Sequence, residues 1–338
     1  MDQGFSDRVL HRFALQNHYF RKFSFERECQ RNQSRAKPDR KNVFIVGLAR
    51  AGSTALLNSL YASGQFAATT YRLMPFVLAP SMSAKLSAFA STSPVMTERA
   101  HGDGLQVGAG SPEALDGIFW STFQSTTPDA VQIQEVPGPI INRYAQFIEN
   151  LLAHENRERY LSKMNQGIGK LESLSQYFEN SVFLIPYRDP LQQAASLLRQ
   201  HRRFSRLSGY QRRYLGWQGH HEFGALHRGF LKPTRSIDWH TLNYWLDQWQ
   251  LTYSYLSELM TKRQNLIPIA YESLTESSEP WRQLGQKLDL QLEPGEFRDC
   301  NRDDTHEGSL IDERKLEDCM ILYTRLGERA QGRLCSPD

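Results

Sequence analysis

The sequence is poor in cysteine and has no long apolar run. Its four cysteines, Cys29, Cys300, Cys319 and Cys335, are scattered along 338 residues without the spacing of a metal site or a disulfide framework. No stretch approaches the roughly 18 consecutive apolar residues that mark a membrane-spanning helix. The opening residues, MDQGFSDRVLHRF, lack the apolar core of a signal peptide. We therefore expect free thiols, no transmembrane segment, no bound metal and a cytoplasmic location.

Neither positive nor negative charge is in large excess. The 40 Lys and Arg residues nearly balance the 37 Asp and Glu residues, which leaves a net charge of +3. An excess this small does not by itself indicate a nucleic-acid partner, so we expect none. The length fits one large α/β domain with insertions, and internal repeats are absent. Nothing in the sequence indicates the oligomeric state.

The chain is organised around residues 43–60, VFIVGLARAGSTALLNSL. The first four residues are apolar and predict a short buried strand. Gly47 ends that strand, Gly52 permits a second tight turn, and leucines at helical spacing follow from Ser53 onward. Strand, glycine-bounded loop and helix in this order are the context in which a phosphate-binding loop is expected.

The loop lacks the lysine of a nucleotide-binding P-loop. Gly47, Gly52 and Thr54 match the pattern G-x-x-x-x-G-K-[ST], but Ser53 occupies the lysine position. In that pattern the lysine reaches the β- and γ-phosphates and the next hydroxyl holds Mg²⁺. Backbone N–H groups at the helix N-terminus still offer an anion site, and Arg50 adds a positive charge. The loop therefore indicates anion binding and disfavours a P-loop kinase, for which we also find no magnesium-binding acid.

A second anion-binding pattern follows the strand predicted at residues 181–187. Arg188 ends that strand, Pro190 suits the first turn of a helix, and Ser196 lies eight residues after Arg188. A guanidinium group at a strand end, with a hydroxyl nearby, suits a phosphate monoester.

Both patterns resemble those of the sulfotransferases. The loop is similar to the family's [KR]-[ST]-G-[ST]-T, with Ala51 in place of the usual Ser or Thr. Arg188, Pro190 and Ser196 reproduce the family's R-x-P-x-x-x-x-x-S pair, which binds the donor's 3′-phosphate. The Lys-x-Asn sequence at residues 163–165 and the YESL sequence at residues 271–274 also resemble family segments. The resemblance covers most of residues 43–290.

This resemblance implies a single three-layer α/β domain, with a mainly parallel central sheet and helices on both faces. It also implies 3′-phosphoadenosine 5′-phosphosulfate as co-substrate, without a metal, and sulfuryl transfer to a hydroxyl or amine. We expect preorganised donors to dominate catalysis, with Arg50 and Lys163 among the catalytic residues. The expected donor-binding residues are Arg50, Ala51, Gly52, Ser53, Thr54, Arg188 and Ser196.

A general base must remove the acceptor's proton, and three residues are candidates. His101 comes first because an unperturbed histidine pKa of about 6.5 suits neutral pH. Asp103 is close enough in sequence to orient it, although the ERAHGDG segment also fits a solvated surface turn. Glu113 and Glu135 are the other candidates. Ser111 and Pro112 predict a helix start just before Glu113, and residues 131–135 predict a short strand.

Residues 199–235 concentrate positive charge. They hold nine Arg or Lys residues, four His residues and one acid, Glu222, interleaved with six aromatic residues. Such a mixture suits an anionic glycan and also occurs where proteins bind single-stranded nucleic acid. The alternatives are a solvated insertion and a basic flap over the donor. We favour an anionic carbohydrate as acceptor and keep a non-catalytic nucleotide- or polyanion-binding protein as the alternative function.

The whole chain, residues 1–338, is predicted to form one domain. Residues 1–41 are expected to be a helical N-terminal extension, and residues 199–238 a basic, aromatic-rich insertion. A long core helix is predicted at residues 239–262 and a final strand at residues 266–270.

Overall fold

The central sheet is parallel throughout. The computed structural model describes residues 5–87, 97–98, 106–124, 130–231, 238–295 and 311–335. Within these ranges one sheet has the strand order β2-β6-β1-β7-β9, and every neighbouring pair is parallel. Its strands are β1 (Val43–Ile45), β2 (Phe66–Ala68), β6 (Arg159–Lys163), β7 (Val182–Tyr187) and β9 (Leu266–Ala270). The expected parallel α/β sheet is confirmed.

Helices cover both faces of this sheet. Val43 and Ile45 pack with leucines of α3 and with Trp281 of α12 on one face. Phe44 and Val46 point the other way, into a larger core that includes Tyr144 of α6 and Trp245 of α10. This alternation buries both faces of β1, which explains its continuously apolar sequence. The three-layer prediction is therefore confirmed.

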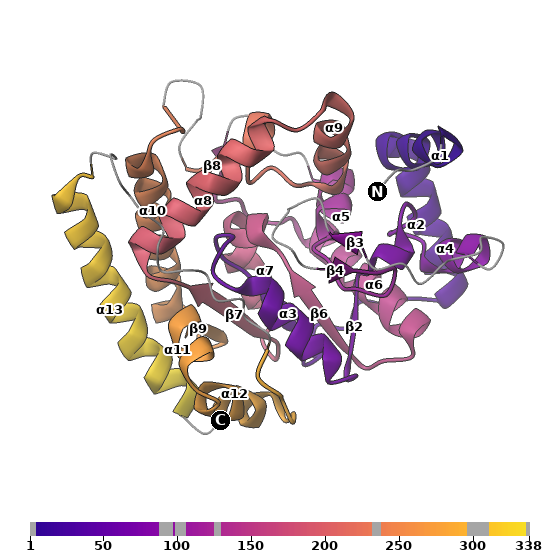
Figure 1. Ribbon diagram of the computed structural model, residues 1–338. Helices are drawn as coiled ribbons and strands as arrows, with labels where there is room; N and C mark the ends of the chain where they lie inside the picture. Colours follow the sequence, from indigo (N-terminus) through magenta and orange to yellow (C-terminus); the bar gives the residue numbers. More distant parts are fainter. Residues whose placement is uncertain are drawn as a thin grey trace.

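The helices surround the sheet as Figure 1 shows: α3 crosses in front of the strands, α10 and α13 lie at the left, and α1, α2 and α4 lie at the right. The α-helices are α1 (Phe5–Gln16), α2 (His18–Asn32), α3 (Ser53–Ala62), α4 (Pro80–Ser87), α5 (Asp116–Phe123), α6 (Gly138–Glu155), α7 (Leu171–Tyr177), α8 (Pro190–Ser205), α9 (Gly209–Gln218), α10 (Leu242–Lys262), α11 (Tyr271–Glu276), α12 (Glu279–Leu288) and α13 (Glu313–Cys335). Short 3₁₀ helices are η1 (Tyr71–Leu73), η2 (Asn165–Lys170) and η3 (Gly224–Leu226).

The N-terminal helices pack onto the domain. Ala14, Leu15 and Phe25 are buried, and the Phe25 ring lies 5.0 Å from that of Phe123 on α5. None of the helices in the described ranges is both long and apolar enough to cross a membrane. The division into one domain with an extension at residues 1–41 and an insertion at residues 199–238 stays a prediction.

The predicted helix start at Ser111 is wrong. The helix begins at Asp116, because the preceding residues pair with the end of β2 instead of coiling. Thr70 and Pro112 form an antiparallel bridge, and the Glu113 N–H donates to the Thr69 carbonyl at 2.9 Å. These hydrogen bonds between two segments of the chain use the backbone groups that a helix would need.

The strand predicted at residues 131–135 is shorter than expected and lies outside the central sheet. Only β5 (Ala130–Val131) is extended, and it pairs in parallel with β8 (Gly229–Phe230). A second small sheet joins β3 (Thr97–Glu98) and β4 (Gln106–Val107) in antiparallel order. The pairing of β5 with β8 ties the basic segment, residues 199–235, to the middle of the chain.

The aromatic residues of the basic segment do not all lie on the surface. Phe204, Phe223 and Phe230 are buried in the main core. Tyr210 and Tyr214 stack at 6.1 Å, and Tyr214 also stacks on His11 of α1 at 5.7 Å. Three of the six aromatic side chains are therefore part of the hydrophobic core and are not available to stack on a sugar.

Candidate active site

Three strands of the sheet deliver the predicted donor residues to one edge. β1 runs into the loop at residues 46–52, β6 ends at Lys163, and β7 runs into Arg188. β1 lies directly between β6 and β7, and Ile45 is in register with both Lys163 and Leu184. Ligands of parallel α/β sheets bind at this carboxyl edge, where the loops leave the strands.

The donor loop, residues 47–54, has a tightly turned backbone. Arg50 and Gly52 both have left-handed conformations, with φ of 70° and 77°. Glycine adopts this conformation easily, whereas at Arg50 it requires support from the surroundings. The side-chain amide of Gln193 on α8 supplies support by donating to the Ala49 carbonyl at 2.9 Å. Ala51 is fully buried.

A direct hydrogen bond joins the two anion-binding patterns. Arg50 Nε donates to Ser196 Oγ at 3.1 Å, across 146 residues of sequence. The bond brings the loop after β1 against the helix after β7, with one positive charge at the junction. Ser196 is buried, and Arg50 is half-buried.

Arg188 is a buried guanidinium group with unused hydrogen-bonding capacity. Its side chain is 3% exposed and donates to Gln192 Oε1 at 2.8 Å. The guanidinium carbon lies 4.7 Å from the centre of the Tyr271 ring, a cation–π contact. Within the described part of the chain the buried Nε has no hydrogen-bond partner. A buried donor without a partner is costly, and an anionic ligand would satisfy it.

Lys163 supplies the charge that the loop lacks at Ser53. Its Nζ lies 3.2 Å from Thr54 Oγ1 and 2.9 Å from Glu113 Oε1, and both charged side chains are almost fully buried. Glu113 also accepts from the Ala114 N–H at 2.9 Å and from the Tyr71 hydroxyl at 2.7 Å. An ammonium group from β6 therefore lies beside the Thr54 hydroxyl in the first turn of α3.

A polar network beneath Glu113 holds this region in place. Asp116 is 1% exposed and accepts hydrogen bonds from Tyr144, Tyr160 and Ser162. Burial raises the pKa of Asp116, and the three hydrogen bonds oppose that rise. The network fixes α5 against α6 and β6, the strand that carries Lys163.

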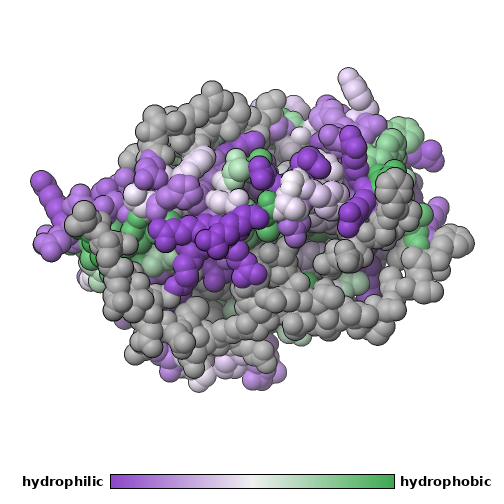
Figure 2. Space-filling model, turned by 45° about the horizontal axis from the view of Figure 1, so that its top comes forward, coloured by the Kyte–Doolittle hydropathy of each residue, from purple (hydrophilic) through white to green (hydrophobic). Residues whose placement is uncertain are grey.

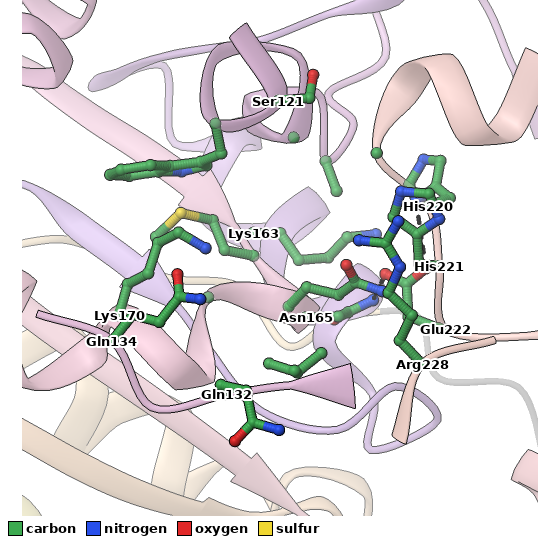
Figure 3. Close-up of a pocket in the computed structure, with 18 of the residues that line it drawn as sticks. Ser121, Gln132, Gln134, Lys163, Asn165, Lys170, His220, His221, Glu222 and Arg228 are labelled. Atoms are coloured by element: carbon green, nitrogen blue, oxygen red, sulfur yellow. Dashed lines mark hydrogen bonds and ion pairs between the residues drawn. The ribbon is translucent and has the colours of Figure 1, made fainter. Parts of the chain in front are cut away.

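A pocket opens beside Lys163 (Figure 3). Lys170 and Gln134 lie on one side of it, while His220, His221, Glu222 and Arg228 lie on the other. The close approach of α5 to the end of α9 forms part of the wall, since a Cβ atom on Gly117 would lie 2.5 Å from the Gln218 carbonyl oxygen.

The charged groups of the pocket are strongly perturbed. Burial and the neighbouring Arg228 charge lower the pKa of Lys170 to about 8 and that of His221 to about 4. Burial by itself would raise the pKa of Glu222, but hydrogen bonding and attraction from His220 and His221 lower it to about 2. At neutral pH the pocket therefore presents a neutral His221, an ionised Glu222 and cationic Lys170 and Arg228.

Comparison with known proteins decides the family. A model of the sulfotransferase family matches residues 42–294, most of the chain. The protein belongs to the sulfotransferase family. No curated protein matches its sequence.

Three solved structures are similar to this sulfotransferase. Sulfotransferase STF1 from Mycobacterium tuberculosis is 11% identical with a TM-score of 0.49, over 96% of this chain and 85% of that one. Sulfotransferase STF9 from Mycobacterium avium is 12% identical with a TM-score of 0.48, over 95% and 78%. A sulfotransferase from Alicyclobacillus acidocaldarius is 13% identical with a TM-score of 0.41, over 88% and 97%.

The sulfotransferase brings most of its predicted site residues to one edge. The segments that follow β1, β6 and β7 bring together Arg50, Thr54, Lys163, Arg188 and Ser196. Arg50 is hydrogen-bonded to Ser196, and Lys163 to Thr54. The predicted base His101 and its neighbour Asp103 lie outside the described residues. Within the described ranges no three His, Cys, Asp or Glu side chains gather as a metal site.

The two glutamate candidates are placed very differently. Glu113 contacts Lys163 at the donor loop. Glu135 is exposed and lines a separate depression with Glu172 and Tyr177. Of the two glutamates, only Glu113 lies beside the loop after β1. Its ion pair with Lys163, 50 residues further along the chain, could not be predicted from the sequence around either residue.

Other residues around the candidate site have little signal in the sequence. Gln193, which supports the loop, lies within the Arg188–Ser196 pattern, and that position was its only available clue. Lys170 and Trp120 come from different elements and meet only in the folded chain.

Proposed function

We propose that this sulfotransferase moves a sulfuryl group from 3′-phosphoadenosine 5′-phosphosulfate to a hydroxyl or amine of a carbohydrate. The observation that supports this best is the hydrogen bond from Arg50 to Ser196. It joins a loop suited to a phosphosulfate with a pair suited to a 3′-phosphate, as one two-ended donor would require.

The residues present fit such a donor. Arg188 and Ser196 would hold the 3′-phosphate, since the buried Arg188 Nε has no hydrogen-bond partner among the described residues. The first backbone N–H groups of α3, together with Arg50, would hold the 5′-phosphosulfate. Lys163 stands beside Thr54, where it can stabilise negative charge that develops during transfer.

The donor, when bound, supplies a sulfuryl group and leaves as adenosine 3′,5′-bisphosphate. As the acceptor oxygen forms its bond to sulfur, the bond from sulfur to the phosphate oxygen breaks. The acceptor's proton needs a base, and we propose Glu113, the carboxylate nearest the loop. Its neighbour Ala114 lines the pocket from which an acceptor would enter. His101 remains the alternative base.

The lining of the pocket supports a sugar as the acceptor. Gln132, Gln134 and Asn165 offer amide groups that both donate and accept, and Trp120 offers a ring. Hydroxyl groups on a sugar need such amphoteric partners, and its C–H faces pack on aromatic rings.

The first test is transfer of radiolabelled sulfate to a panel of glycan, lipid and phenolic acceptors. Glu113→Gln should lower transfer by roughly 10²–10⁴-fold, the usual contribution of a general base, and His101→Ala should change it little. Binding of adenosine 3′,5′-bisphosphate, measured by calorimetry, should stay normal in both variants.

Each other result has a definite meaning. Loss of transfer in His101→Ala alone would make His101 the base and Glu113 a positioning residue for Lys163. Binding of the bisphosphate without transfer to any acceptor would favour the non-catalytic alternative.

A further inference from the structure

Lys170 is a half-buried cation that lines the pocket. It ends η2, and its Nζ lies 5.3 Å from the centre of the Trp120 ring. In the parts of the chain that the structure describes, no carboxylate pairs with it. Burial and Arg228 make its ammonium form less stable, as its pKa of about 8 shows. Burying an unpaired ammonium is costly, and a nearby anion would remove much of that cost.

Two carboxylates at or near the pocket in the described part of the chain, Glu222 and Glu113, already have partners. Glu222 accepts from Asn165 at 3.4 Å and lies 3.6 Å from His220 Nδ1. Glu113 is bound to Lys163 and to the Tyr71 hydroxyl. Neither carboxylate pairs with Lys170, so the described residues leave its charge without a carboxylate partner.

The position of Lys170 suits a ligand that also reaches the reaction centre. Lys163 and Lys170 line the same pocket, with Asn165 between them in sequence (Figure 3). Gln134 lies beside Lys170, where its amide can bind a hydroxyl of the same ligand. A ligand bound there would have one end near Glu113 and its charged end at Lys170.

We propose that Lys170 binds an acidic group of the acceptor sugar, a carboxylate or a sulfate ester, and so selects acidic sugars over neutral ones. This rests on the proposed function, because it takes the pocket to be the acceptor site. Arg228 faces the same pocket and adds to its positive potential.

The experiment compares two sugars that differ only at one carbon. Protein saturated with adenosine 3′,5′-bisphosphate is titrated by calorimetry with 4-nitrophenyl β-glucuronide and with 4-nitrophenyl β-glucoside. We expect the acidic sugar to bind about tenfold more tightly, as one charge-assisted contact would produce. A glucoside 6-sulfate in a third titration shows whether Lys170 prefers the carboxylate or the sulfate ester.

Variants assign the preference to Lys170. Lys170→Met should abolish it, Lys170→Arg should largely keep it, and Lys262→Met, which changes an exposed lysine on α10, should leave it unchanged. In NMR of ¹³C-methylated lysines, the acidic sugar should raise the pKa of Lys170. A lysine with a purely structural role would show neither the lost preference nor the raised pKa.

The inference is overturned if both sugars bind equally, if neither binds, or if the preference survives in Lys170→Met. Its failure is separate from failure of the proposed function. If the protein does not bind adenosine 3′,5′-bisphosphate but still selects the glucuronide through Lys170, the proposed donor is wrong and the anion site stands.

Discussion

Lys163 brings a positive charge to a loop that lacks the P-loop lysine. Its ammonium group reaches the first turn of α3 from β6, the strand next to β1 in the sheet. Because Glu113 and Thr54 hold the ammonium on two sides, it keeps one position without a ligand. Such preorganisation lowers the cost of stabilising charge in a transition state.

Arg188→Ala should weaken binding of adenosine 3′,5′-bisphosphate by about 1.5–3 kcal/mol, the usual value of a hydrogen bond to a charged group. The reason is that the Nε of this buried guanidinium group has no hydrogen-bond partner among the residues that the structure describes. Calorimetry on the folded variant measures the change. Arg282→Ala serves as the control, because Arg282 is an exposed arginine paired with Glu279. Equal affinity in wild type and Arg188→Ala would remove Arg188 from the donor site.

Some residues of the site could be predicted because their neighbours in sequence are also their neighbours in space. Arg50, Gly52 and Thr54 share one loop, and Arg188 and Ser196 share one strand–helix turn. Lys170 could not be predicted in this way. Its partner Trp120 is on a different element, and its unusual pKa arises from tertiary burial.

At the scale of elements, buried histidines lie where α8, η3 and α10 pack together. His201 accepts from the Gly224 N–H at 3.2 Å, and His227 lies 2.6 Å from the Tyr244 hydroxyl. Burial is the main cause that lowers the pKa of His201 to about 4 and that of His227 to about 3. Both rings are therefore neutral in the folded protein at neutral pH.

Acid should destabilise this packing. Between pH 6.5 and the lowered pKa values the unfolded chain binds more protons than the folded one, so stability falls as the pH falls. For His227 alone the loss at pH 5 is about 2 kcal/mol. Urea unfolding from pH 7 to pH 5 measures it. His227→Gln should flatten the slope, whereas His154→Gln on α6 should not. If the free energy of unfolding of His227→Gln falls with pH as steeply as that of the wild type, this histidine is not buried in its neutral form.

Element type was predictable where the apolar pattern was strong. β1, β7 and β9 are apolar runs that end in turn residues, and α10 has core residues at helical spacing. The start of α5 was not predictable, because Ser111 and Pro112 are good helix-starting residues. Hydrogen bonds to Thr69 and Tyr71 outweighed that local preference.

Across the whole molecule, positive charge is unevenly distributed. The net charge is +3, yet the basic segment at residues 199–235 carries nine Lys or Arg residues against one acid. Arg203, Arg206 and Arg213 are exposed. Among the coloured side chains on the face seen in Figure 2, most are hydrophilic, with smaller hydrophobic patches between them. Such a field attracts anions from a distance and weakens as salt is added.

Changing Arg203, Arg206 and Arg213 to Glu should lower kcat/KM for an acidic sugar and flatten its dependence on salt. Affinity for adenosine 3′,5′-bisphosphate should change little. The measurement is transfer to 4-nitrophenyl β-glucuronide at low and at physiological ionic strength. Lys41, Lys262 and Arg282 changed to Glu are the matched control, with the same change of net charge on other surfaces. If affinity for adenosine 3′,5′-bisphosphate falls strongly and kcat/KM for the sugar is unchanged, the segment covers the donor site instead of binding the acceptor.

The adjacency of β1 and β7 in the sheet has an evolutionary consequence. Arg50 comes from the loop after β1, and Arg188 and Ser196 come from the end of β7 and the helix α8 that follows it. The pocket walls come largely from other stretches, at residues 114–121, 130–134 and 219–228. One part of the chain can therefore stay constant across descendants while the other diverges. On the proposed function, a lineage built on this plan could acquire new acceptors by exchanging wall segments, without changing the residues proposed to bind the sulfate donor.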